Sequence, residues 1–143
     1  MIDALTGRSS ALFKRLIDEG LVDMGFGGEL FNGFGYSCVM FGGTSKDPEK
    51  AAEIIKEEIK NAQVNGIDKA AFERSKRKAY GRFVMNYNDI DDTANLLMDM
   101  GFNGYEPFAE LDACRNLTLE KVQERLAVLK EESAALSVIS PIG

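Results

Sequence analysis

The chain has 143 residues, of which 45% are apolar and 28% charged, an ordinary balance for a folded globular protein of one domain. Its 17 basic and 23 acidic side chains give a net charge of −6, which argues against a nucleic-acid partner because phosphates attract cationic surfaces. Every apolar run is shorter than the roughly 18 residues that span a bilayer, so we expect no membrane partner.

The first predicted elements are a helix and two strands. Ser9-Ser10 can cap a helix that ends at Gly20. Asn32-Gly33 is a strong hairpin signal, and it stands between two stretches with the period of a β-strand. Apolar side chains take alternate positions in these stretches, first at Met24, Phe26 and Leu30 and then at Phe34, Tyr36, Cys38 and Met40.

A series of helices follows. Asp47, with Pro48 behind it, begins a helix whose apolar stripe runs to Gly66, and Asp68 caps the next helix. Further helices are predicted after the acidic residues of 89–92, at 107–114 and after an N-cap at Thr118. Residues 134–139 form an apolar, β-compatible run that we predict to be a last strand.

This order of elements predicts an α+β fold. Strands and helices are segregated along the chain rather than alternating, which disfavours a parallel sheet. We expect a small antiparallel sheet, made of the hairpin and the C-terminal strand, packed against several helices. The chain shows no repeat, low-complexity stretch or linker, so residues 1–143 are predicted to form a single domain.

Basic residues gather in one stretch. Residues 69–82 hold six Lys and Arg side chains and a single acid, Glu73. Such a run is usually the solvated face of a helix, and the functional alternative is a surface for an acidic partner. The sequence leaves both interpretations open.

Two other patterns suggest ligand sites but fail on their spacing. Glycines in residues 25–35 resemble a phosphate loop, yet Leu30 and Cys38 replace the last glycine of G-x-G-x-x-G in its two registers. Glycines within strands more often mark a bulge, a twist or the close approach of another backbone. The acids that begin at Asp89 resemble a calcium loop, but its twelfth position is Met100 instead of Glu.

Histidine is absent from the sequence. This absence removes the usual nitrogen ligand of zinc and the Ser-His and Cys-His pairs that activate nucleophiles. It also removes the commonest general base near neutral pH. We therefore predict no catalytic residues, no metal ligands and no cofactor in this chain.

Cys38 and Cys114 lie far apart and form no C-x-x-C motif. With no signal peptide visible, they are predicted to be reduced thiols in a cytoplasmic protein. A single disulfide between them is the alternative.

Five segments together resemble the carboxy-terminal, non-zinc-binding domain of pitrilysin/insulinase metallopeptidases, especially compact bacterial members. They are GRSSALF, GTSKDPEK, GIDKAAFERSK, LTLEKV and ALSVISP, at residues 7–13, 43–50, 66–76, 117–122 and 135–141. Each segment alone has low specificity, but their order and spacing extend over almost the whole chain.

The resemblance implies a division of labour. In such peptidases an amino-terminal domain carries H-x-x-E-H and binds zinc, and a similar carboxy-terminal domain without the motif closes over the peptide. Many members place an Arg and a Tyr after the first helix to hold the substrate backbone. If this chain lacks one residue there, these positions fall on Ile17 and Asp23, which cannot do the same work. The residues that bind substrate are therefore unknown.

The resemblance also implies partners. The chain is shorter than a complete domain of the family, so we expect it to be a carboxy-terminal fragment that pairs with the catalytic domain of the same protein and with peptide substrates. Zinc is expected only in that amino-terminal part. Open strand edges should be covered by another copy, giving a homo-oligomer. The alternative is a catalytically inactive α+β interaction or scaffold domain, and a self-contained Lys or carboxylate enzyme is a third interpretation.

Overall fold

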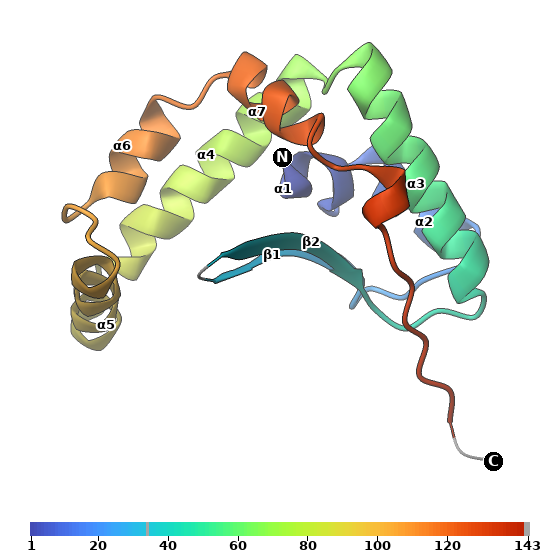
Figure 1. The fold of residues 1–143 in the computed structure, drawn as a ribbon, viewed down its shortest axis with the longest axis horizontal. Coiled ribbons are helices and arrows are strands. Elements are labelled where there is room, and N and C mark those ends of the chain that lie inside the picture. The colour runs from blue at the N-terminus through green and yellow to red at the C-terminus, as the bar shows by residue number, and fades with distance from the viewer. Residues whose placement is uncertain (34, 142–143) are drawn as a thin grey trace.

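A computed structural model describes residues 1–33 and 35–141. Helices α3, α4, α6 and α7 form an arch above a two-stranded hairpin, and α5 lies at one end of the arch (Figure 1). This arrangement confirms the α+β prediction. In chain order the elements are α1 (Ile2–Thr6), α2 (Ala11–Asp18), β1 (Gly27–Gly33), β2 (Tyr36–Gly42), α3 (Pro48–Asn65), α4 (Lys69–Asn86), α5 (Ile90–Phe102), α6 (Ala109–Arg115), α7 (Leu119–Leu126) and a 3₁₀ turn (Glu131–Ser133).

Side-chain caps begin the predicted helices at the expected residues. The Asp47 carboxylate accepts from the backbone N–H of Lys50 at 3.1 Å, and Pro48 is the first residue of α3. Ser10, Asp68, Asp89 and Thr118 likewise accept backbone N–H bonds at the starts of α2, α4, α5 and α7. Each cap satisfies an N–H group that the helix leaves unpaired.

The hairpin is present, but its turn is two residues later than predicted. Asn32 and Gly33 belong to β1, and Gly33 pairs with Tyr36 in an antiparallel register. Gly35 has a φ of 81°, a left-handed conformation that glycine adopts without strain. The turn therefore forms where Gly35 stands, and the predicted strand residue Phe34 lies outside the described residues.

Glycine at position 28 allows α1 to pack directly against the hairpin. A Cβ atom there would lie 2.7 Å from Ile2 Cγ2 and 2.8 Å from Thr6 Oγ1. The approaching atoms belong to side chains, whereas the sequence favoured a bulge, a twist or a neighbouring backbone for glycines within strands. Helix α1 itself was not predicted, because five residues are too few for a helical period to emerge.

Two small hydrophobic cores hold the helices, and α3 contributes to both. One core joins α1, the end of α3, α4 and α7, and the other joins α2, the start of α3 and Phe26 ahead of β1. Leu126 and Leu16 are almost fully buried in the first and second core, respectively. The buried members are Ala4, Leu5, Ala62, Ile67, Phe72, Val122 and Leu126, and then Leu12, Phe13, Leu16, Leu21, Phe26, Ala51 and Ile54.

Polar contacts of Asp3 fasten α1 to α4. Its carboxylate accepts from Ser75 Oγ at 2.9 Å and forms an ion pair with Lys78. Partial burial raises the pKa of Asp3, but the hydrogen bonds from Lys78 and Ser75 outweigh it, so that the pKa lies below its usual value. The Asp3–Lys78 ion pair beside the first core therefore helps to hold α1 against α4.

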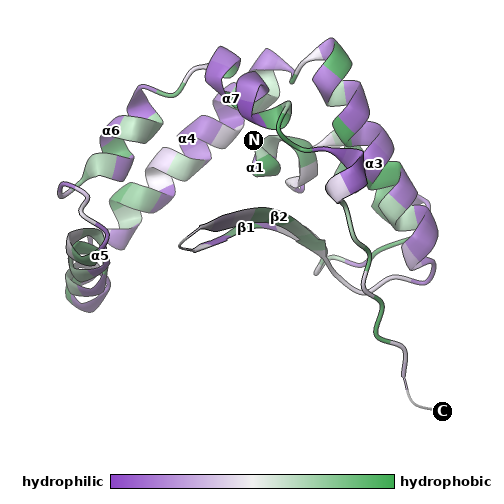
Figure 2. Cartoon of the chain, viewed as in Figure 1, coloured by the Kyte–Doolittle hydropathy of each residue, from purple (hydrophilic) through white to green (hydrophobic). Residues whose placement is uncertain are grey.

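The predicted C-terminal strand is wrong. Residues 134–141 take no part in the sheet, which has the order β1–β2 among the described residues. The segment runs away from the arch with hydrophobic residues along it (Figures 1 and 2), and Ile139 is 96% exposed. A strand forms only where a neighbour offers backbone partners, and this segment lies beside no such neighbour.

Both cysteines are free, Cys38 exposed on β2 and Cys114 buried on α6. None of the helices in the described part of the chain combines the length and the hydrophobicity needed to cross a membrane.

The capping hydrogen bond of Ser10 gives a matched test of this fold. Ser10 is buried and its Oγ accepts from Phe13 N at 3.0 Å, whereas Ser9 beside it is exposed. We expect Ser10→Ala to lower the free energy of unfolding by about 1 kcal/mol. Ser9→Ala should leave it nearly unchanged. Urea unfolding followed by circular dichroism compares the two, and equal effects would contradict the assigned cap.

Candidate functional site: the hairpin face and the α4–α6 pocket

The outer face of the hairpin carries exposed aromatic and apolar side chains together with one acid, Glu29, which lies opposite Met40. In the observed register Phe31 lies opposite Cys38, and Gly33 opposite Tyr36, so these side chains share the face that points away from α1. Phe31 and Tyr36 are 52% and 54% exposed, and their ring centroids are 5.8 Å apart. Met40 extends the same face. An exposed aromatic surface of this kind is typical of an interaction site.

The two outer edges of the hairpin are also open. Strands β1 and β2 pair with each other, and within residues 1–33 and 35–141 no other strand pairs with either of them. A single bridge between Val22 and Ser45 lies beyond the base of the hairpin. Unpaired N–H and C=O groups along an edge can pair with an added strand.

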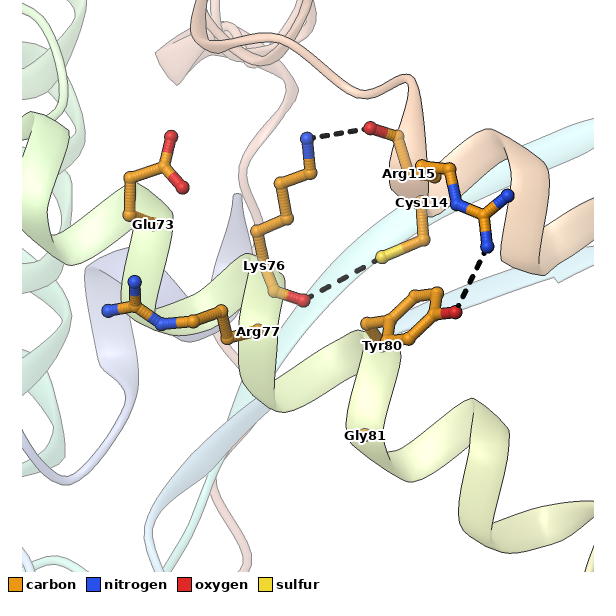
Figure 3. A pocket seen from close by; sticks show the side chains of 7 residues that line it. All are labelled: Glu73, Lys76, Arg77, Tyr80, Gly81, Cys114 and Arg115. Atoms are coloured by element: carbon orange, nitrogen blue, oxygen red, sulfur yellow. Dashed lines mark hydrogen bonds between the residues drawn. The ribbon is translucent and has the colours of Figure 1, made fainter.

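A second candidate site is an open pocket of about 330 Å³ between α4 and α6. Arg115 from α6 lies beside Tyr80 from α4, with its Nη2 atom donating to the phenol oxygen at 3.2 Å (Figure 3). That hydrogen bond keeps the pKa of Arg115 above its usual value. Glu73, Lys76, Arg77, Gly81 and Cys114 complete the lining.

Lys76 holds the two walls of this pocket together. Its Nζ atom donates to the carbonyl oxygens of Arg115 at 2.8 Å and Leu117 at 2.7 Å, at the end of α6. The Cys114 thiol donates to the carbonyl oxygen of Lys76 at 3.7 Å. A cation at the C-terminal end of a helix is favoured by the unpaired carbonyl groups there. Lys76 therefore has a structural task, and its amine is engaged rather than available.

The basic run that the sequence singled out is divided by the fold. Lys76 and Lys78 are held by α6 and by Asp3, respectively. Arg74, Arg77 and Arg82 are exposed, and none has a carboxylate within 4.0 Å among the described residues. The predicted helix face is thus partly structural, and its arginines remain accessible.

At the far end of α4, Tyr87 contacts α6. Its hydroxyl donates to Glu110, and its ring lies against Phe108 with centroids 4.8 Å apart. Burial, together with the hydrogen bond to Glu110 and the charge of that carboxylate, raises the pKa of Tyr87 to about 12. The other carboxylate oxygen of Glu110 is buried without a hydrogen-bond partner in the described part of the chain.

Ile17 and Asp23, the positions that correspond to the family's Arg and Tyr if this chain lacks one residue, have structural roles here. Ile17 packs against the second core, and the Asp23 carboxylate accepts from Gly25 N at 2.8 Å in the turn before β1. Neither belongs to the hairpin face or to the α4–α6 pocket. Within the described ranges, no group of three or more His, Cys, Asp and Glu side chains is placed to hold a metal ion.

Comparison with known proteins places these features in a family. Residues 2–79 match the model of the peptidase M16 inactive domain. The chain is 28% identical over 135 residues to an uncharacterized zinc protease, YmfH, of Bacillus subtilis (strain 168), a match that covers 94% of this chain and 31% of that protein.

A solved structure of a peptidase is also similar to this chain. The crystal structure of an M16-like peptidase from Alicyclobacillus acidocaldarius is similar with a TM-score of 0.78 and 32% identity. The match covers 87% of this chain and 30% of that one. The chain thus spans about a third of the length of both relatives.

The raised pKa of Tyr87 predicts a pH dependence of stability. Between pH 10, the ordinary tyrosine pKa, and about 12 the folded chain keeps a proton that the unfolded chain has lost. The contribution of Tyr87 is therefore complete below pH 10 and is lost as the pH rises towards 12. We expect the free energy of unfolding to fall more steeply over this interval in the unmodified chain than in Tyr87→Phe. Urea unfolding at a series of pH values measures this slope. Tyr105→Phe, at an exposed tyrosine, should give the same slope as the unmodified chain. Equal slopes for Tyr87→Phe and the unmodified chain would contradict the assignment.

Proposed function

This chain belongs to the family of the peptidase M16 inactive domain, and from that membership we propose that it is the non-catalytic carboxy-terminal part of a zinc peptidase and helps to enclose peptide substrates. The membership agrees with the resemblance to the carboxy-terminal pitrilysin/insulinase domain. The names of the two relatives, a zinc protease and an M16-like peptidase, support the activity proposed for the whole protein.

The chemistry of the chain supports a non-catalytic role. Zinc sites in hydrolases are built from His, Cys, Asp or Glu side chains, with one position open for water. The sequence has no histidine, and the described residues bring no three such side chains together. The residues present do not fit a zinc ion, so the zinc of the proposed peptidase belongs to another part of that protein.

The observation that carries the proposal is the exposed outer face of the hairpin. Phe31, Tyr36 and Met40 offer an apolar wall to a peptide side chain, and the open edges offer backbone donors and acceptors. Contacts of these two kinds depend little on peptide sequence, because every peptide has a backbone and most have apolar side chains. The hairpin could therefore contribute to a chamber that accepts many substrates.

The proposal also covers two partners and a location. The proposed partners are the catalytic domain of the same protein and a second copy that covers a hairpin edge. The two free thiols favour a cytoplasmic location. An inactive interaction domain would use the same hairpin face, and an H-x-x-E-H motif elsewhere in the whole protein distinguishes the peptidase from it.

We expect the purified chain to retain no stoichiometric zinc and to cleave no fluorogenic peptide. A hybrid of the Bacillus subtilis relative, in which this chain replaces the matched segment, should cleave peptides faster than the same relative without that segment. Metal analysis by mass spectrometry and fluorescence assays measure both outcomes. Zinc held by this chain together with turnover by the chain alone would overturn the proposal.

The peptide-facing role of the hairpin has its own test. Phe31→Asp should weaken binding of a labelled, extended apolar peptide about 10-fold, because the peptide loses its contact with the aromatic ring that it would cover. Val64→Asp, at an 81% exposed position of α3, should leave the affinity unchanged. Fluorescence anisotropy compares the two, and equal affinities would place the peptide elsewhere.

A further inference from the structure

Charge is strongly segregated along α4, α5 and α6. Residues 69–82 are rich in Lys and Arg, whereas residues 83–114 contain acids and no base. The ion pairs of the described residues do not join one stretch to the other. The acids of the second stretch are Asp89, Asp91, Asp92, Asp99, Glu106, Glu110 and Asp112.

The α4–α6 pocket is lined by three basic side chains, one acid (Glu73) and the Tyr80 ring. Beyond the neighbours of Gly81 and the nearby backbone of α4, no atom lies within 4 Å of the position that a Cβ at Gly81 would take. Arg77 lies at the rim without a carboxylate within 4.0 Å among the described residues, whereas Arg115 opposite it pairs with Asp112 at 3.7 Å and donates to Tyr80 (Figure 3). The complementary shape is a small apolar side chain flanked by carboxylates.

The start of α5 has this composition. Ile90 is 86% exposed, and it is followed directly by Asp91 and Asp92 in the first turn of the helix. The Asp89 side chain caps the helix by accepting from the backbone of these two residues, which fixes the turn. Ile90 therefore protrudes as an apolar side chain from an acidic helix end; it is called the knob below.

The knob of one chain cannot enter its own pocket. Asn86 is nine positions after Arg77 on α4, a distance of about 14 Å along the helix axis. Helix α5 then lies beyond the end of α4, at the tip of the arch (Figure 1). A second copy, by contrast, brings both surfaces, and in a two-fold dimer each knob meets the pocket of the partner.

The geometry points to self-association in which Ile90 of one copy fills the α4–α6 pocket of another, with Asp91 and Asp92 facing Arg77. This contact is independent of the proposed peptide enclosure, and it is an alternative to the hairpin edge as the place where a second copy binds. Opposite charges across the contact fix its register and should make the association sensitive to salt.

A pair of charge reversals tests this contact. Arg77→Glu and Asp91→Lys should each weaken dimerisation about 10-fold or more, because both contacts of the dimer then oppose like charges. In an equimolar mixture of the two variants each contact joins opposite charges, so the dimer should return. Sedimentation equilibrium at low salt measures the association, and circular dichroism checks that each variant is folded.

Matched controls come from α2, where Lys14 and Asp18 are exposed and take part in no ion pair among the described residues. Lys14→Glu and Asp18→Lys should leave the dimer intact. A monomeric unmodified chain, a dimer that persists in Arg77→Glu, or a mixture that stays monomeric would each overturn the inference. A persistent dimer would point to the hairpin edges instead.

Discussion

The contact between α1 and the hairpin at Gly28 determines which surface of this chain meets solvent. Side chains alternate across a strand, so the face that carries Gly28 and Phe41 turns towards α1 and the opposite face turns away. A side chain at position 28 would clash with Ile2 and Thr6. With Gly28 there, Phe31 and Tyr36 are left exposed on the outer face, and the proposed function depends on them.

Packing also divides the chain into a firmly held part and an outer arm. Both hydrophobic cores lie among α1, α2, α3, α7 and the start of α4. Beyond Phe72, α4 buries no further residue, and the arm is held by the polar contacts of Lys76 and Tyr87 and by two buried side chains, Met100 and Cys114, that belong to neither core. Segments with few buried contacts open at a lower free-energy cost than a core does. The arm therefore has both accessible charges and local freedom to adjust to a partner.

Local signals in the sequence predicted most of the fold. Asp47, Asp68 and Thr118 each cap a helix as expected, because an N-cap bonds to a backbone group two or three residues away and needs no other part of the chain. The third strand at 134–139 was wrong because strand pairing requires a distant neighbour. The turn moved to Gly35 because two glycines compete for it and the pairing of β1 and β2 decides between them.

The candidate site was harder to predict than the fold. The α4–α6 pocket joins Tyr80 to Arg115, thirty-five residues apart, and neither residue belongs to a motif. The basic run on α4 was visible, but its sequence could not separate the engaged Lys76 from the accessible Arg77. The β2 half of the hairpin face was visible as alternating Tyr36, Cys38 and Met40. In the first strand the predicted alternate position was Leu30, on the opposite face from Phe31, because the register is set by pairing and not by alternation alone.

A chain without imidazole groups can still be essential to a peptidase, because enclosing a peptide and cleaving it make different physical demands. Cleavage needs a metal or a base within bonding distance of one carbonyl group. Enclosure needs backbone groups and apolar area spread over many ångströms, and the hairpin offers both at its edges and on its outer face. The surface to which the proposed function assigns enclosure therefore depends on Gly28 and the packing of α1 as well as on Phe31 and Tyr36 themselves.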